Sequence, residues 1–154
     1  MIIIRKAVLN DEHIIEDILK KTGLFSSHSY KNTENAMVIE TEDSIAGCGG
    51  LQIIGEIAIL KYLSILPEYR CQGLGDGLTR ALVNYADRRN VKKIYLLLNK
   101  PTDYFKRFGF KNISSEDIQE KYKTLNILKT DATKFNYIME LDIEEFFNNR
   151  HCHH

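Results

Sequence analysis

The chain has 154 residues, of which 44% are hydrophobic and 27% are charged, a composition that fits one soluble globular domain with a substantial core. Lysine plus arginine and aspartate plus glutamate both number 21, so the net charge is zero, which disfavours a nucleic-acid-binding protein. The apolar stretches fall short of the roughly 20 residues that span a bilayer, and the first residues lack the basic region of a signal peptide, so we expect no membrane partner.

The chain begins with an expected strand and helix. β-Branched residues from Ile2 to Val8 predict the strand, and Asn10 or Asp11 can cap a helix that Gly23 ends. The buried face of this helix should consist of Ile14, Ile15, Ile18 and Leu19. The polar stretch 24–35 is expected to form a loop or a poorly formed second helix.

A hairpin is expected next. Strand-like residues at 36–41 and 45–54 flank a short polar turn, and a long strand follows at 56–65. Gly49 and Gly50 inside the second of these strands predict a bulge or a close backbone contact.

Helices and strands then alternate. Helical spacing of apolar residues predicts a helix over about 74–89, and the apolar run 93–98 predicts a strand buried on both faces. Thr102 or Asp103 can cap a short helix that Gly109 ends. Further elements are expected as a short strand at 110–113, a helix start at 114–117 and a last strand at 136–143.

Antiparallel strands followed by a β-α-β crossover predict an α+β (mixed α/β) fold, a mixed sheet with helices packed on it. We expect a single domain over 1–146 and a disordered tail over 147–154. The tail contains His151, Cys152, His153 and His154, but no second ligand cluster would complete a metal site, so we expect no metal. The scattered cysteines Cys48, Cys71 and Cys152 favour a reduced, cytoplasmic setting.

Residues 66–78 read LPEYRCQGLGDGL, three glycines within five residues between a strand and a helix. A helix start exposes about four unpaired N–H groups, and glycine lets a phosphate approach them. A Walker loop would need a lysine and a serine or threonine where Asp76 and Gly77 follow Gly75. A dinucleotide fingerprint would need a third glycine where Leu78 stands.

The stretch Arg70-Cys71-Gln72-Gly73-Leu74-Gly75 resembles instead the pyrophosphate loop Q/R-x-x-G-x-G/A of the GNAT superfamily of acetyl-CoA-dependent N-acyltransferases. The preceding Ile65-Leu66-Pro67-Glu68-Tyr69 is also typical of that superfamily, and Tyr104–Phe110 is similar to its later helix ending in Gly-Phe. The resemblance spans residues 1 to about 143. It implies the GNAT fold, a mostly antiparallel sheet of six to seven strands in which 56–65 and 93–98 splay apart.

The resemblance also implies that acetyl-CoA is the cosubstrate. Its pantetheine arm would pair with backbone groups of Leu63, Ser64 and Ile65, and the Leu63 N–H would stabilise the oxyanion formed when an amine attacks the thioester. Further coenzyme contacts are implied for Arg70 as a cation, for the backbone N–H groups of Cys71, Gln72, Gly73, Leu74, Gly75 and Asp76, and for Asn99 and Phe105. Turn chemistry is an equal alternative for Asn99, and Cys71 would be a bystander beside the pyrophosphate.

The proton transfers are less well defined. Many relatives place a tyrosine, the acid for the leaving thiolate, four residues before the helix-ending glycine, where this chain has Phe105. Tyr104, Tyr62 or water are the alternative donors. Glu56 could deprotonate the amine through water, although a solvated strand-end carboxylate is the favoured interpretation.

Phe105, together with 46–51 and 95–98, resembles a narrower branch of short N-acetylglutamate synthase-like and arsinothricin-type acetyltransferases. That branch acetylates the α-amine of amino-acid-like molecules, and its members often have an arginine where Lys61 stands. Lys61 could therefore anchor a substrate carboxylate, or it could simply extend from the strand to solvent.

The expected function is N-acetyl transfer to a small-molecule amine by direct attack, in a monomer or homodimer. One alternative is a catalytically inactive coenzyme-A-binding module. A protein N-acetyltransferase is a further alternative, disfavoured because the sequence shows no added segment for peptide recognition.

Overall fold

The computed structural model describes residues 1–22, 33–118, 120–123 and 135–148. The chain forms two compact units, built from Met1–Ile53 with Leu60–Arg89 and from Ile54–Ile59 with Asn90–His154. Strand β4 (Ile57–Ile65) contributes its first three residues to the second unit and the rest to the first. The single domain over 1–146 stays a prediction.

Seven strands form one sheet in the order β1-β2-β3-β4-β5-β7-β6. The pairs β1–β2, β2–β3, β5–β7 and β6–β7 are antiparallel, whereas β4 and β5 are parallel, so the predicted α+β fold with a mixed sheet is confirmed. The strands besides β4 are β1 (Ile3–Lys6), β2 (Ala36–Glu40), β3 (Ile45–Ile54), β5 (Lys93–Leu98), β6 (Lys111–Ile113) and β7 (Tyr137–Asp142). The described α-helices are α1 (Glu12–Lys21), α2 (Leu74–Arg88), α3 (Glu120–Lys123) and α5 (Ile143–Asn148).

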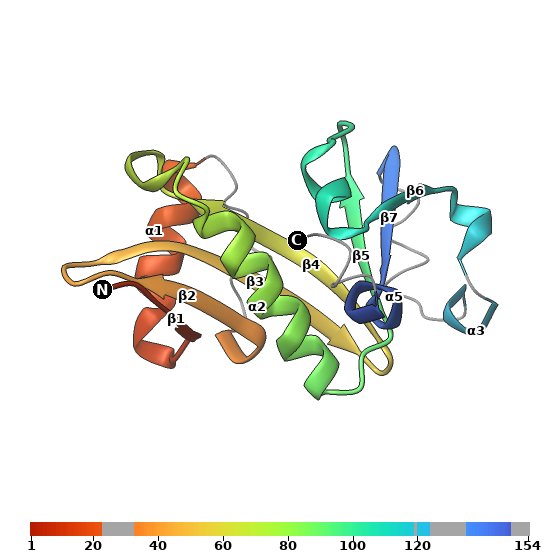
Figure 1. Cartoon of the computed structure of the whole chain (residues 1–154), viewed down its shortest axis with the longest axis horizontal. Coiled ribbons are helices and arrows are strands. Elements are labelled where there is room, and N and C mark those ends of the chain that lie inside the picture. The colour runs from red at the N-terminus through yellow and green to blue at the C-terminus, as the bar shows by residue number, and fades with distance from the viewer. Residues whose placement is uncertain (23–32, 119, 124–134, 149–154) are drawn as a thin grey trace. The chain divides into compact units, whose positions relative to one another are not determined.

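In the first unit, α1 and α2 cover opposite faces of the strands (Figure 1). Ile15, Ile18 and Leu19 of α1 are buried, as predicted, and they pack with Val38, Cys48 and Tyr62 of the strands. Ile14 was expected on the same face, but it is 40% exposed. One residue turns a helix by about 100°, which takes Ile14 off the stripe that its neighbour Ile15 occupies. Gly23, the expected helix end, lies outside the described residues.

Asp11 has a different role from the predicted helix cap. It precedes α1, but its side chain makes no cap hydrogen bond to the helix. Its carboxylate accepts hydrogen bonds from Arg5 Nη1 at 2.8 Å, from Arg5 Nη2 at 3.1 Å and from the Val8 N–H at 2.8 Å. Arg5 Nε also donates to Glu40 at 3.0 Å. The network joins β1, β2 and the start of α1, and the Arg5 hydrogen bonds hold the pKa of Asp11 below its ordinary value.

Replacing Asp11 with asparagine should lower the free energy of unfolding at pH 7 by about 2–3 kcal/mol, the usual worth of hydrogen bonds to charged groups. Because the folded-state pKa of Asp11 is depressed, the stabilisation is present above the unfolded value of about 3.9 and is lost as the pH falls through the folded value. Urea unfolding should therefore show the difference between wild type and variant closing in acid. Glu16→Gln, which breaks a surface pair with Lys20, is the control and should cost less than about 1 kcal/mol. A difference that did not change with pH would contradict the ion-pair role.

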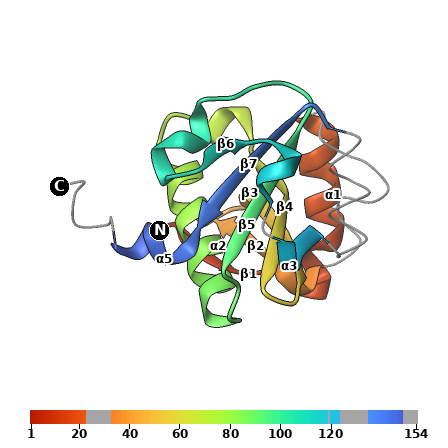
Figure 2. The same cartoon turned by 90° about the vertical axis from the view of Figure 1, so that its right-hand side faces the viewer.

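In the second unit, β5 is the strand predicted to be buried on both faces, and Ile94, Tyr95 and Leu96 are all buried. It lies beside β7, and α5 continues directly from β7 (Figure 2). The Tyr95 hydroxyl donates to Glu140 Oε2 at 2.8 Å, and Lys93 Nζ lies 2.9 Å from Asp142 Oδ2. The sequence does not predict α5, which includes the first two residues of the expected tail; the remaining tail residues lie outside the described part of the chain.

Candidate functional site

The second half of β4 presents different side chains to its two faces. A methyl group placed on Gly49 would lie 2.7 Å from Leu82 Cδ1 of α2 and 3.2 Å from Leu63 Cδ1, so Leu63 points to the α2 side. Alternation along the strand puts Lys61 and Ile65 on that side as well. Ser64 faces α1 instead, where its hydroxyl donates to Thr22 Oγ1 at 2.8 Å. The side chains of Leu82 and Leu63 thus pack directly on Gly49, and Ser64 could contact a ligand on the α2 side only through its backbone.

The glycine loop joins β4 to α2 through two residues with left-handed backbone conformations. Cys71 has φ of 66° and Gly73, the N-cap of α2, has φ of 77°. No side chain caps the helix, and the first helical hydrogen bond runs from the Gly77 N–H to the Gly73 carbonyl at 3.1 Å. The N–H groups of the first turn are therefore left without helical acceptors at the positive end of a 15-residue helix.

The space beside Gly73, at the N-cap of α2, is open. A methyl group on Gly73 would meet no atom within 4 Å, and Cys71 and Gln72 are exposed. The arrangement suits an anion that approaches the backbone from solvent.

Arg70 ties the loop to the end of β4. Its Nε donates to the Ile65 carbonyl at 2.9 Å, and its side chain is exposed. The bond holds the guanidinium next to the left-handed residues, where its charge adds to that of the helix start.

Lys61 is exposed, and it has no ion-pair partner among the residues that the structure describes. It lies on the same side of β4 as Leu63, as the sequence predicts. Both interpretations of Lys61, an anchor for a carboxylate and a solvent-facing cation, stay open.

Tyr62 lies on the opposite side of β4, under α1. Its ring leans over Gly50, where an added methyl group would be 2.5–2.6 Å from its ring edge and hydroxyl. Burial raises the pKa of Tyr62, and within the described part of the chain its hydroxyl is a buried polar group without a hydrogen-bond partner. Facing away from Leu63, Tyr62 is poorly placed as the proton donor that the sequence left open.

Glu56 belongs to the second unit and is engaged with neighbours there. Lys121 Nζ donates to the Glu56 carboxylate at 3.0 Å, and the Tyr122 hydroxyl donates to the same carboxylate at 3.4 Å. The hydrogen bond from Lys121 lowers the pKa of Glu56. An exposed, ion-paired carboxylate is a weak base, so the arrangement favours the strand-end interpretation over the catalytic one.

Tyr104 and Phe105 open a 3₁₀ helix over Tyr104–Phe108, which ends at Gly109 with φ of 103°. The two rings meet edge to face with centroids 5.0 Å apart, and Phe105 also lies 5.7 Å from the Phe110 ring. The Arg107 guanidinium lies 4.6 Å from the centroid of the Tyr104 ring. Asn99 is exposed in a bend after β5. The predicted roles of these residues stay predictions.

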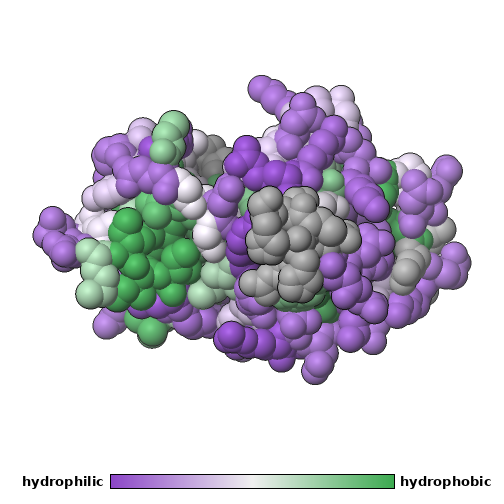
Figure 3. Space-filling model, viewed as in Figure 1, coloured by the Kyte–Doolittle hydropathy of each residue, from purple (hydrophilic) through white to green (hydrophobic). Residues whose placement is uncertain are grey.

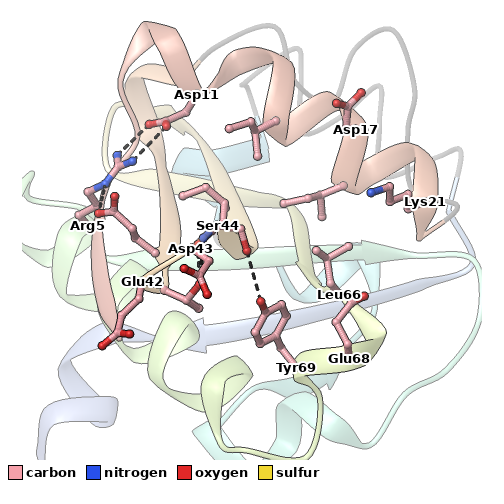
Figure 4. Close-up of a pocket in the computed structure, with 15 residues that line it drawn as sticks. Arg5, Asp11, Asp17, Lys21, Glu42, Asp43, Ser44, Leu66, Glu68 and Tyr69 are labelled. Atoms are coloured by element: carbon pink, nitrogen blue, oxygen red, sulfur yellow. Dashed lines mark hydrogen bonds and ion pairs between the residues drawn. The ribbon is translucent and has the colours of Figure 1, made fainter. Parts of the chain in front are cut away.

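A cavity of about 620 Å³ in the first unit has no counterpart in the sequence-based expectations. It lies between α1, the turn from β2 to β3 and the segment that follows β4 (Figure 4). Arg5 and Lys21 contribute positive charge, but the lining also contains six carboxylates, those of Asp11, Asp17, Glu40, Glu42, Asp43 and Glu68. This excess of negative charge disfavours a phosphate, which leaves the start of α2 as the better phosphate site.

Over the described ranges, no helix has the length and apolar character needed to cross a membrane. No three His, Cys, Asp or Glu side chains within those ranges gather in a way that could hold a metal ion.

The family model for the acetyltransferase (GNAT) domain matches residues 32–112. An amino-acid acetyltransferase of Aeromonas salmonicida is 27% identical over 123 residues, which cover 74% of this chain but only 28% of that protein. A putative [ribosomal protein bS18]-alanine N-acetyltransferase of Bacillus subtilis is 32% identical over 94 residues, 58% of this chain and 60% of that protein. N-acetylglutamate synthase from Neisseria gonorrhoeae, solved with coenzyme A and N-acetyl-glutamate, shares the fold with a TM-score of 0.73 at 18% identity, over 93% of this chain and 35% of that one. Since the family model covers more than half of the 154 residues, including the glycine loop, the chain belongs to the GNAT acetyltransferase family.

Proposed function

We propose that this protein is an acetyl-CoA-dependent N-acetyltransferase that acts on the amine of a small, amino-acid-like molecule. The observation that carries the proposal is the glycine loop. Cys71 and Gly73 have left-handed backbone conformations, no side chain caps the start of α2, and the space beside Gly73 is open. This arrangement directly follows the strand whose backbone would bind the acyl-pantetheine arm.

The first unit would hold the coenzyme through its backbone. The N–H groups between Cys71 and Asp76 would donate to the pyrophosphate, with Arg70 as the adjacent cation. The N–H groups and carbonyls of Leu63, Ser64 and Ile65 would pair with the pantetheine amides. The Ile65 carbonyl already accepts from Arg70 Nε, so its second lone pair would serve the ligand.

The reaction would be a direct transfer. The amine nitrogen bonds to the thioester carbon, the C–S bond breaks, and the amine loses a proton while the thiolate gains one. The Leu63 N–H would donate to the developing oxyanion. Phe105 has no proton to give, and the pairing of Glu56 with Lys121 weakens it as a base, so water or Tyr104 would serve these transfers. A thiol pKa near 8.5 makes unassisted departure of the thiolate feasible.

The acceptor class is supported by Lys61 and by the relatives. Lys61 is an exposed cation on the Leu63 side of β4, where it could pair with a substrate carboxylate. The Aeromonas relative is named for acetylation of amino acids, although this chain spans 28% of its length. The Bacillus relative is named for the alanine of a ribosomal protein, so a peptide amine is the competing acceptor.

The test is thiol release from acetyl-CoA with three groups of acceptors: free amino acids, simple alkylamines without a carboxylate, and a peptide with an N-terminal alanine. We expect release with amino acids well above that with alkylamines. Turnover confined to the peptide would replace the small-molecule assignment with protein acetylation.

Phe105 also motivates a second candidate, a module that binds coenzyme A without catalysis. The same assay distinguishes it when paired with calorimetry. Tight coenzyme binding with no thiol release on any amine would favour the binding module, whereas failure to bind coenzyme at all would refute both candidates.

Replacing Lys61 with methionine should raise the KM for amino acids far more than the KM for alkylamines. Only the amino acids carry a carboxylate that would lose its ion pair with Lys61. A loss of one charge-assisted contact corresponds to about tenfold or more in KM. Lys61→Arg keeps the charge and should retain most of the activity, and Lys92→Met removes another exposed lysine as a control. An equal rise in KM for both amine classes would mean that Lys61 only shapes the strand.

A further inference from the structure

Ser64 carries a buried hydroxyl in a strand that is otherwise largely apolar. It is 5% exposed, and Asp11 and Thr79 are the other buried polar or charged residues in the part of the chain that the structure describes. Asp11 binds Arg5, and Thr79 donates to the Gly75 carbonyl of its own helix. Burying a hydroxyl costs free energy unless it is hydrogen-bonded, and alanine would fill a buried strand position without that cost. The hydroxyl of Ser64 therefore calls for its own explanation.

The partner of Ser64 is Thr22, the residue at which α1 ends. Ser64 Oγ lies 2.8 Å from Thr22 Oγ1, and Thr22 Oγ1 donates to the Ile18 carbonyl at 2.9 Å. Because the single hydroxyl proton of Thr22 goes to a carbonyl, the proton between the two hydroxyls must come from Ser64. The two bonds form a chain from the side chain of β4 to the backbone of α1. Unlike the apolar contacts around it, this chain is directional, so it fixes how the end of α1 packs on β4.

The second half of β4 has limited backbone support. Among the described residues, the pairing of β4 with β5 ends at Ile59. The later residues of β4 lie beside β3, and directly after the strand the Leu66 N–H donates to the Ala46 carbonyl at 2.9 Å. The position of these later residues therefore depends on β3 and on the contacts of their own side chains.

Ser64 would act from the face away from the ligand. α1 and α2 cover opposite faces of the strands in the first unit (Figure 1), and the space-filling view from the same side shows the α2 face, with a hydrophobic patch near the N-terminus (Figure 3). The Ser64 hydroxyl points to α1, whereas Leu63 points to α2. Any effect of this hydroxyl on a ligand at Leu63 must therefore pass through the backbone of β4.

We propose that Ser64 and Thr22 are positioning residues for acetyl-CoA, an inference that rests on the coenzyme site proposed above. Their hydrogen bond holds the backbone on either side of Ser64, where the Leu63 N–H would donate to the oxyanion and where Leu63 and Ile65 would pair with the pantetheine arm. Neither hydroxyl touches the coenzyme. Without the bond this stretch of β4 is less ordered, and the coenzyme must order it on binding, which weakens the affinity.

The test is calorimetric titration of coenzyme A into variants of the pair. Ser64→Ala removes the donor, and Thr22→Val removes the acceptor at nearly constant volume. Each should raise the Kd for coenzyme A by about three- to tenfold, the range that one net hydrogen bond supports. The double variant should bind no more weakly than either single variant, because all three lack the same bond. Thr22→Ser keeps the hydroxyl and should retain wild-type affinity.

Tyr85→Phe is the matched control for the loss of a buried hydroxyl. The Tyr85 hydroxyl lies 2.8 Å from the Glu34 carbonyl and 2.8 Å from Asn35 Oδ1, near the end of α2 away from Gly73 and roughly 18 Å along the helix axis from it. This variant should lower the Tm, as Ser64→Ala should, but leave the Kd for coenzyme A unchanged.

The outcomes separate the positioning role from the coenzyme site itself. Wild-type affinity in Ser64→Ala or in Thr22→Val would show that the pair serves the fold alone, and it would overturn the proposal. Additive losses of affinity in the double variant would overturn it as well, because the two hydroxyls would then act independently. A wild type that binds no coenzyme A would refute the coenzyme site, and the proposal with it.

Discussion

Replacing Gly73 with valine should weaken the binding of coenzyme A by about 100-fold, equivalent to about 2.7 kcal/mol. Gly73 has φ of 77°, a conformation that a β-branched residue adopts only under strain. Valine would either force the backbone out of the left-handed region or place its side chain in the open space in front of the N–H groups. Both outcomes remove the surface that the pyrophosphate would occupy. Calorimetric titration with coenzyme A measures the effect.

Gly55→Val is the matched control for backbone strain. Gly55 has φ of 59° and, like Gly73, has no atom within 4 Å of an added methyl group, but it lies in the turn between β3 and β4. We expect this variant to lose a similar amount of stability, roughly 1–2 kcal/mol, and to keep its coenzyme affinity. If Gly73→Val stays folded and binds coenzyme A as wild type does, the loop is not the pyrophosphate site.

Saturating coenzyme A should slow the alkylation of Cys71 by an order of magnitude or more. Cys71 is an exposed free thiol within the loop, so a pyrophosphate on the adjacent N–H groups would cover it. The negative charge of the phosphates would also disfavour the thiolate, which is the reactive form. Alkylation followed by peptide-resolved mass spectrometry gives the rate at each cysteine separately.

The other cysteines provide internal references. Cys48 is buried, and burial raises its pKa to about 12, so it should react far more slowly than Cys71 in the free protein. Cys152, near the end of the chain, should react at the same rate with and without coenzyme. Equal rates for Cys71 in both conditions would show that the glycine loop is bare surface.

Local patterns in the sequence determined most of the elements that form the glycine loop and its surroundings. The apolar run of β4, the three glycines and the helical spacing of α2 each depend on residues a few positions apart, and all three elements are where they were predicted. The same holds for β5, whose continuous apolar run predicted a strand buried on both faces. Secondary structure of this kind follows from local periodicity.

The tertiary structure decided which residues meet across the sheet. Asp11 could be read as a helix cap, but the pairing of β1 with β2 brings Arg5 between it and Glu40, and a charged hydrogen bond outweighs a cap. From the sequence, Glu56 could act as a base. In the folded chain it pairs with Lys121, which lies 65 positions away, and the pairing weakens it as a base. Tyr62 and Leu63 are neighbours in β4, and successive side chains of a strand point to opposite faces of the sheet, so Tyr62 points away from the Leu63 side. Contacts between distant segments depend on strand order and register, which local spacing does not encode. The glycine loop and the family therefore follow from residues close together in the sequence, whereas the pairing of the charges around the loop follows from the folded chain.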